Sequence, residues 1–121
     1  KLASSKQRVY VLYPIPELPT HITKLIDREL SVNGELGSIE GTDRSWYEER
    51  NSVIINHFKS ANYPDNVVLI NPANYFCGSE ACFSTKGGHS LYFDDNHVSN
   101  YGASLIAEDI IQNKNSGISV Q

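Results

Sequence analysis

The sequence predicts an α/β domain built on a parallel sheet, because apolar, strand-like runs alternate with amphipathic, helix-like segments. Residues 9–13 and 67–70 are apolar or aromatic at every position, which is typical of strands buried on both faces of a sheet. Two strands are too few for a stable parallel sheet, which needs several neighbouring strands. We therefore expect an incomplete sheet, whose other strands come from upstream residues or from a partner chain.

The first helix follows a proline-rich segment. Prolines within residues 14–19 force an extended conformation after the first strand. Thr20 is expected to cap a helix that runs to about Val32, and Gly34 is expected to end it. Residues 34–42 are rich in glycine and polar residues, so we predict a connector without regular structure there.

Two more helices are predicted. Ser45 and Glu48 match the S-x-x-E capping box, which predicts a helix over residues 45–61 with Trp46 as a packing anchor at its start. Ser99 is expected to cap a last helix over residues 101–113. In the helix over residues 45–61, the side chains expected to face the core are Tyr47, Ile54, Phe58 and Ala61. In the helix over residues 101–113, they are Leu105, Ile106, Ile110 and Ile111.

Charge and hydropathy narrow the class of protein. The net charge is −4 and the basic residues are scattered, which argues against a nucleic-acid-binding surface. No apolar run approaches the roughly 20 residues of a membrane-spanning helix. Residues 1–6 contain neither an initiating Met nor an apolar signal-peptide core. We expect the chain to begin inside a longer polypeptide, with any export signal or anchor upstream.

The two cysteines, Cys77 and Cys82, enclose a short polar loop that contains Gly78. Such a loop tolerates a local disulfide, which would indicate an oxidising compartment. Half of a zinc site is an alternative, although no second pair of ligands lies nearby in the sequence. Two free buried thiols are the other alternative.

The run from Asp94 to His97 is the strongest candidate for chemistry. In a hydrolytic triad, a histidine takes the proton of the nucleophile while a carboxylate on its other ring nitrogen fixes the tautomer. A D-x-x-H spacing in a turn before a helix lets the carboxylate fold back onto the imidazole. Three other interpretations remain open: Asp94 or Asp95 binds loop N–H groups, His97 is merely exposed, or these residues bind a metal together with His89.

The remaining candidates have weaker signals. His21 and His57 lie on predicted helices and are expected to be ordinary surface or core-edge residues. His89 follows two glycines near the candidate pair, so it could contact substrate. Glu17 follows the first strand at the end where α/β folds bind ligands. Tyr92 and Phe93 are expected to pack in the core, although aromatic rings also stack on sugars.

Several motifs occur together in a recognisable order: a Pro-x-Pro-Glu segment after the first strand, Ser-Trp-Tyr-Glu at a helix start, Asn-Pro after the second strand, the cysteine pair, and Tyr-Phe-Asp-Asp-Asn-His-Val-Ser with Gly-Ala shortly after. This arrangement resembles the SGNH domain fused to integral-membrane acyltransferases of the acyltransferase-3 family, over residues 8–111. Proteins of that family O-acetylate surface polysaccharides such as lipopolysaccharide O-antigen.

The resemblance implies a flavodoxin-like, three-layer α/β/α SGNH-hydrolase fold, of which residues 1–121 would form only the C-terminal part. It implies that Asp94 is the orienting acid, that His97 is the general base, and that Cys77 and Cys82 are the family's cysteine pair. The family's nucleophile lies in a Gly-Asp-Ser block that has no match in this sequence. Ser4 and Ser5 lack its context, and the oxyanion-hole donors also belong to earlier blocks.

We therefore expect part of an O-acyltransferase, on the periplasmic or extracellular side of a bacterial inner-membrane protein, with an acyl donor and a glycan acceptor as substrates and no metal or organic cofactor. The expected partners are an upstream membrane acyltransferase domain and the N-terminal half of the SGNH domain, with a homo-oligomer across the open sheet edge as another possibility. The alternative functions are a non-catalytic glycan-binding or docking module and a stand-alone SGNH esterase.

Overall fold

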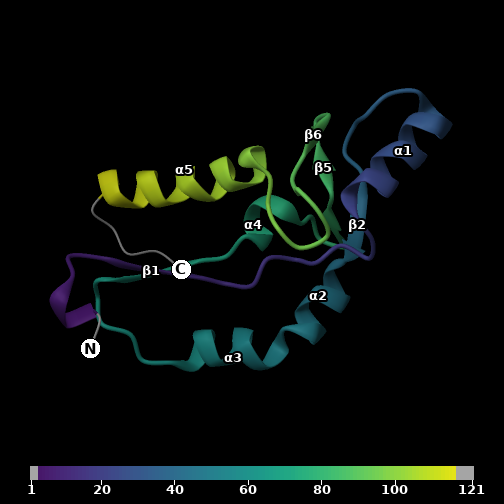
Figure 1. Ribbon diagram of the computed structural model, residues 1–121. Helices are drawn as coiled ribbons and strands as arrows, with labels where there is room; N and C mark the ends of the chain where they lie inside the picture. Colours follow the sequence, from purple (N-terminus) through teal and green to yellow (C-terminus); the bar gives the residue numbers. More distant parts are fainter. Residues whose placement is uncertain (1–2, 117–121) are drawn as a thin grey trace.

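A computed structural model describes residues 3–116 (Figure 1). Helices and strands alternate along most of the chain, as the apolar periodicity predicts. The elements are η1 Ala3–Ser5, β1 Val9–Leu12, α1 Ile22–Asn33, β2 Glu40–Asp43, α2 Arg44–Arg50, α3 Ser52–Ser60, β3 Val67–Ile70, α4 Ala73–Phe76, β4 Ala81–Phe83, β5 Thr85–Lys86, β6 His89–Ser90 and α5 Asn100–Ser116.

The two apolar runs form the predicted parallel pair, β1 and β3. Val9 lies opposite Val67, and Leu12 lies opposite Ile70. The N–H of Tyr13 continues the ladder by donating to the carbonyl of Ile70 (2.9 Å). All four residues of β3 are buried, which explains why its sequence is apolar throughout rather than alternating.

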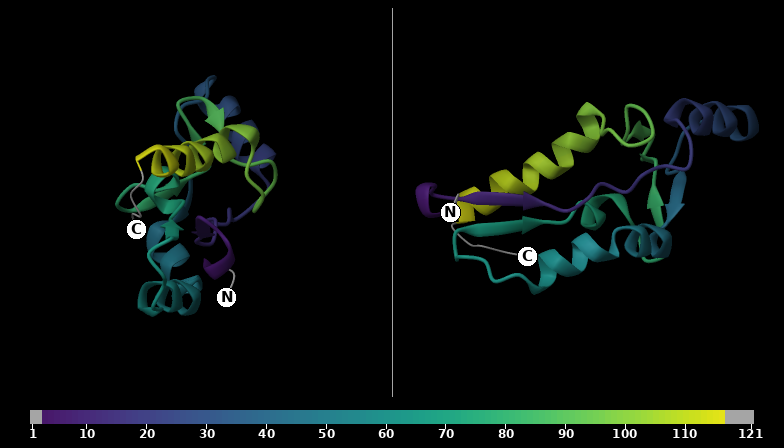
Figure 2. Two further views of the ribbon diagram at one scale, coloured as in Figure 1. Left: turned by 90° about the vertical axis from the view of Figure 1, so that its left-hand side faces the viewer. Right: turned by 60° about the horizontal axis from the view of Figure 1, so that its bottom comes forward.

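Helices cover both faces of this pair, so the local architecture is a three-layer sandwich. Figure 1 and both views of Figure 2 show α5 on one face and α3 on the other. Val68 and Ile70 pack in the core cluster that contains Ile106 of α5. Val67 and Leu69 point the other way, into the cluster that contains Ile55 of α3 and Tyr47 of α2. The predicted α/β architecture is confirmed in this partial form.

The edge of β1 that faces away from β3 carries no partner strand among residues 3–116. Val9 and Tyr13 donate their N–H groups towards β3, so the backbone groups of Tyr10 and Leu12 point to the opposite side. The side chain of Leu12 is 44% exposed. The sheet is therefore incomplete at this edge, as expected from the presence of only two long apolar runs.

Two short antiparallel pairs lie outside this sheet. β2 pairs with β4, and β5 forms a hairpin with β6 through Gly87 and Gly88, both of which have positive φ. The prediction of an irregular connector over residues 34–42 was wrong for its last part, since β2 begins at Glu40. Its side chains are polar and therefore lack the apolar pattern of a strand, and it forms because β4 provides a partner.

The helix predicted over residues 45–61 is two helices, α2 and α3, separated at Asn51. The break changes the helical phase, so Ile55 is buried and Ile54 is 38% exposed, contrary to the prediction. Trp46 is also 43% exposed and lies under the guanidinium of Arg50 (5.3 Å) rather than in the core.

Three smaller predictions also need correction. His21, not Thr20, caps α1, because its ring accepts the N–H of Thr23 (3.3 Å). Asp43 stands at the start of α2 in place of the predicted capping box. Ile111 of α5 is 56% exposed rather than buried.

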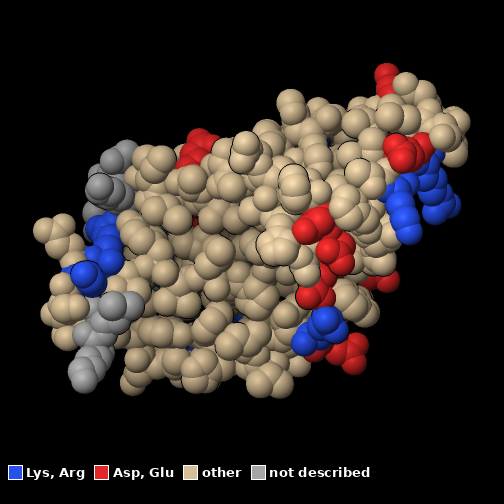
Figure 3. All heavy atoms as spheres, in the orientation of Figure 1, with Lys and Arg blue, Asp and Glu red and all other residues tan. Residues whose placement is uncertain are grey.

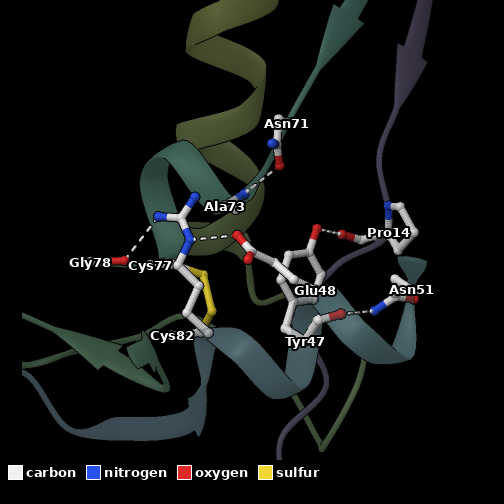
Figure 4. Close-up of polar contacts among 10 residues, drawn as sticks. Pro14, Tyr47, Glu48, Asn51, Asn71, Ala73, Cys77, Gly78 and Cys82 are labelled. Carbon is white, nitrogen blue, oxygen red and sulfur yellow. Dashed lines mark hydrogen bonds and ion pairs between the residues drawn. A yellow bond between two sulfur atoms is a disulfide. The ribbon is translucent and has the colours of Figure 1, made fainter. Parts of the chain in front are cut away.

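The disulfide between Cys77 and Cys82 is present. It closes the turn between α4 and β4, and Figure 4 shows it beside α2. Arg44 fastens the same turn to α2: Nη1 donates to the carbonyl of Gly78 (2.9 Å), and Nε donates to Glu48 (2.9 Å). A disulfide thus fixes a loop that is too small to have a hydrophobic core of its own.

The surface is mixed in charge. Figure 3 shows Lys and Arg at separate places on the face drawn, with Asp and Glu between them. That face therefore presents no continuous basic surface of the kind that binds phosphate backbones. Within residues 3–116, no helix combines the length and the apolar character needed to cross a bilayer.

Candidate active site

The segment that contains the D-x-x-H motif is a tight loop between β6 and α5. A β-bridge pairs Tyr92 with Val98 across its base. The N–H of Phe93 donates to the carbonyl of His97 (2.7 Å), which closes the loop. The sequence permits this turn because four polar residues, Asp94 to His97, follow the exposed Phe93, which comes after the buried Leu91 and Tyr92.

Asp94 organises the loop with both carboxylate oxygens. Oδ1 accepts the backbone N–H groups of Asn96 (2.9 Å) and His97 (2.7 Å). Oδ2 lies 2.7 Å from Nδ1 of the His97 ring. The sequence left open whether Asp94 contacts the imidazole or binds loop N–H groups. In the structure it does both. The predicted pair is brought together.

These contacts shift the ionisation of both groups. The N–H groups of Asn96 and His97, and then the His97 ring, hold the pKa of Asp94 well below its usual range. The hydrogen bond from Asp94, and then its charge, raises the pKa of His97 above 6.5. Asp94 therefore stays ionised at neutral pH. An ionised carboxylate only accepts hydrogen bonds, so Nδ1 carries a proton and Nε2 remains as the basic nitrogen of the neutral ring.

The ring of His97 is accessible, because its side chain is 77% exposed. It borders a groove of about 760 Å³ between α1 and the start of α5. The groove is lined by Ile22, Ile26, His89, Ser90, Tyr92, Phe93, His97, Val98, Ser99, Asn100 and Tyr101. A second cavity, of about 540 Å³, lies beside Tyr13 and Phe58 and contains none of the predicted site residues.

The segment that follows β1 holds the loop in place. The N–H of Leu18 donates to the carbonyl of Asp95 (2.8 Å), and the N–H of Ile22 donates to the carbonyl of Asp94 (3.1 Å). The buried hydroxyl of Tyr92 donates to the carbonyl of Pro16 (2.6 Å), and burial raises its pKa. The stiff proline-rich segment, residues 14–19, thus supports the loop, and we call this segment the brace. It can be followed from β1 to the loop in Figure 1.

A second buried tyrosine fixes the near end of this brace. The hydroxyl of Tyr47 donates to the carbonyl of Pro14 (2.9 Å), as Figure 4 shows. Burial, and then the charge of Glu48, raises the pKa of Tyr47 to about 12. Both phenols are therefore protonated donors at neutral pH, and neither is available as a base.

The start of α5 fixes the other side of the loop. Oγ of Ser99 accepts the N–H of Gly102 (3.0 Å) and donates to the carbonyl of Ser90 (2.6 Å). Ser99 is therefore the helix cap that the sequence predicts. Gly102 is needed because a Cβ at this position would lie 2.3 Å from the carbonyl oxygen of Leu91.

The other predicted candidates are placed as follows. His21 caps α1, and the ring of His57 lies 6.2 Å from that of Phe58 on α3. Glu17 is not brought to the pair, because its carboxylate binds Nε of Arg50 (2.6 Å). His89 does line the groove and stacks on Tyr101 at 4.6 Å.

The expectation for the two loop aromatics was half wrong: Tyr92 is buried, but Phe93 is 75% exposed. Tyr101 also lines the groove, but it was not a candidate from the sequence, because a tyrosine at a helix start carries no catalytic signal. Within residues 3–116, no three His, Cys, Asp or Glu side chains gather as metal ligands do, so the alternative with Asp95 and His89 has no assembled ligand set.

The serines near the Asp94–His97 pair donate their hydroxyl groups to backbone carbonyls. Ser90 donates to the carbonyl of Tyr92 (2.7 Å), and Ser99 donates to that of Ser90. Ser4 and Ser5 lie in η1 before the amino end of β1, whereas the brace that holds the loop follows its carboxyl end. Figure 1 shows η1 and the β6–α5 loop towards opposite ends of β1.

Searches of curated proteins and of solved structures found no match for this chain. A family model described as "SGNH domain (fused to AT3 domains)" matches residues 1–112. The SGNH domains that this model describes are fused to AT3 (acyltransferase-3) domains. The match therefore associates the chain with an acyltransferase domain, with a membrane-protein context and with an acyltransferase-associated role. With a match over most of its length, the chain belongs to the family of SGNH domains that are fused to AT3 domains.

Proposed function

We propose that the chain provides the base and the orienting acid of a Ser-His-Asp triad in an O-acyltransferase, in the simplest case an O-acetyltransferase, that acts on surface polysaccharide. The observation that carries the proposal is the 2.7 Å contact between Oδ2 of Asp94 and Nδ1 of His97. This contact leaves Nε2 as the basic nitrogen of an exposed ring, which suits it to take a proton from a group outside the described loop.

The proposed reaction has two halves. Nε2 of His97 takes the proton of a serine hydroxyl while the serine oxygen bonds to the acyl carbon, and the donor's leaving group departs with that proton. A sugar hydroxyl then gives its proton to His97 while its oxygen bonds to the acyl carbon, and the serine oxygen leaves and is reprotonated. Water in place of the sugar gives ester hydrolysis. Asp94 stabilises the imidazolium in both halves.

The serine has to come from outside the matched motifs, because the 121 residues contain no Gly-Asp-Ser block. We propose that residues 1–121 are the C-terminal portion of an SGNH domain. A further segment would then supply the serine, the oxyanion donors and a strand on the open edge of β1. We call this chain joined to that segment the intact domain. A second copy of this chain on the same edge is the alternative occupant.

The proposed location is the periplasmic or extracellular face of a bacterial inner membrane, with the AT3 domain or another donor providing the acyl group. The Cys77–Cys82 disulfide supports this location, since structural disulfides persist in oxidising compartments. A non-catalytic glycan-binding or docking module is the second candidate. A stand-alone esterase would use the same pair.

Mass spectrometry of the intact domain after rapid mixing with p-nitrophenyl acetate tests the proposal. We expect an acetyl adduct on one serine that accumulates and then decays, and no adduct in His97→Ala. If no acetyl-serine forms with the unsubstituted protein, the triad assignment fails and the docking module becomes the better explanation.

A further inference from the structure

An aromatic pair borders the groove next to the candidate base. His89 of β6 and Tyr101 of α5 stack with their ring centroids 4.6 Å apart and their planes 26° from parallel. Both rings line the same groove as His97. The side chain of His89 is exposed, and that of Tyr101 is 36% exposed.

The stack is not needed to hold its two elements together. Ser99 already joins them, because its Oγ donates to the carbonyl of Ser90 (2.6 Å) and its N–H donates to the carbonyl of Leu91 (3.0 Å). The packing of Gly102 against Leu91 adds a third connection. The exposed faces of this ring pair lie beside a junction that other bonds already hold, so they are available to contact a ligand.

The composition of the groove points to one class of ligand. Phe93, 75% exposed, and the stacked pair present ring surfaces. Asn100, His89 and Tyr101 line the same groove, and each of these side chains carries hydrogen-bonding groups. Sugar rings combine apolar C–H faces with a rim of hydroxyls, so they match a site that combines aromatic surface with a few polar groups. An unsubstituted acyl chain would leave those polar groups without partners.

We propose that the His89–Tyr101 pair, with Phe93 and Asn100, forms the acceptor subsite, in which a sugar ring lies against the aromatic surface with one hydroxyl directed to Nε2 of His97. This inference rests on the proposed function, because it assigns the sugar to the second half of that reaction. It identifies Tyr101 and His89 as residues that bind the acceptor, distinct from the Asp94–His97 pair that transfers protons.

Binding can be tested without catalysis. Methyl α-glycosides of glucose, galactose, mannose and rhamnose are titrated into the intact domain, and the aromatic and backbone NMR signals are followed. We expect at least one glycoside to shift signals of Tyr101, His89 and Phe93, and Tyr101→Ala to abolish the response. Tyr63→Ala, which removes a tyrosine of the other cavity, is the matched control. No shift with any glycoside, or equal shifts in Tyr101→Ala, would overturn the subsite.

Catalysis provides the second test, on the intact domain with p-nitrophenyl acetate and the glycoside that binds. We expect Tyr101→Ala and His89→Ala to lower the ratio of acetyl transfer to hydrolysis about tenfold or more, since attack by the sugar needs the aromatic surface and attack by water does not. Equal loss of transfer and hydrolysis, or an unchanged ratio, would contradict the assignment. His97→Ala serves as the separate test of the proposed function, because it should remove both reactions.

Discussion

Asp94 contacts His97 twice: one carboxylate oxygen accepts the backbone N–H of the histidine (2.7 Å), and the other lies 2.7 Å from Nδ1 of its ring. The same side chain therefore sets both the conformation of the loop and the tautomer of the base. This double contact requires the three-residue spacing, because the turn has to bring the backbone and the ring of His97 to one carboxylate. Substitutions at Asp94 can separate the two roles.

Asp94→Asn should keep much of the loop and lose catalysis. The amide oxygen can still accept the N–H groups of Asn96 and His97, but its NH₂ group cannot accept a proton from Nδ1, so the ring is held in the wrong tautomer. We expect the turnover of p-nitrophenyl acetate by the intact domain to fall by about a thousandfold or more. Backbone NMR shifts of the loop should change less than in Asp94→Ala, which loses both contacts. Turnover close to that of the unsubstituted protein would show that Asp94 does not orient the base.

The pH dependence follows from the shifts of the same pair. The folded pKa of His97 lies above 6.5, so the stabilisation it contributes is complete below 6.5 and is lost as the pH rises through the raised value. The folded pKa of Asp94 lies below 3.8, so its contribution is present above 3.8 and is lost as the pH falls through the lowered value. The pair is therefore strongest between these limits.

Catalysis needs neutral His97, so we expect activity to increase with pH through its raised pKa. An NMR titration of the ring protons should give a pKa above 6.5 that decreases in Asp94→Asn. A value at or below 6.5 that is unaffected by this substitution would contradict the ion pair.

Tyr92→Phe tests the brace between the loop and the segment after β1. It removes the buried hydroxyl bond to Pro16 and leaves that carbonyl without its partner. We expect the free energy of unfolding to decrease by about 1–3 kcal/mol, measured by urea denaturation, and turnover to decrease as the loop loosens. Tyr63→Phe, at a partly buried tyrosine of the other cavity, is the control and should change neither quantity appreciably. A neutral Tyr92→Phe would show that the brace does not depend on this bond.

The sign of the stability change in Gly102→Ala is diagnostic. In an ordinary helix position, replacing Gly by Ala stabilises the protein by up to about 1 kcal/mol. Here the new Cβ would lie 2.3 Å from the carbonyl oxygen of Leu91, so α5 has to move away from the loop base. We expect a loss of about 1–3 kcal/mol in thermal or urea unfolding. Gly37→Ala, whose Cβ would meet nothing within 4 Å, should be close to neutral. Stabilisation by Gly102→Ala would mean that the helix start is not packed this tightly.

The sequence predicts those parts of the fold that depend on burial by local residues. β1 and β3 were identified because their positions are almost all apolar, and Cys77 and Cys82 because they lie close together in the chain. β2 was missed because its residues are polar and its strand conformation depends on pairing with β4. The phase change that buries Ile55 instead of Ile54 depends on the break at Asn51.

The candidate site also combines local contacts, which the sequence predicts, with long-range contacts, which it does not predict. The contact between Asp94 and His97 was predictable, since it spans three residues in one turn. The bond from Tyr92 to Pro16 spans 76 residues, and the stack of His89 on Tyr101 joins a hairpin to a helix. No local pattern encodes either of them. Phe93 was expected to pack in the core, but the loop turns at that position and exposes its ring.

The central claim is that His97 is the base of this domain, and the rates of p-nitrophenyl acetate turnover by the intact domain and two histidine variants test it most directly. His57→Ala is the matched control, because His57 is an exposed histidine on α3, the helix on the opposite face of the sheet from α5. We predict that His97→Ala reduces turnover by about a thousandfold or more and that His57→Ala stays within about twofold of the unsubstituted protein. Equal activity in all three proteins would contradict the assignment of His97 as the base.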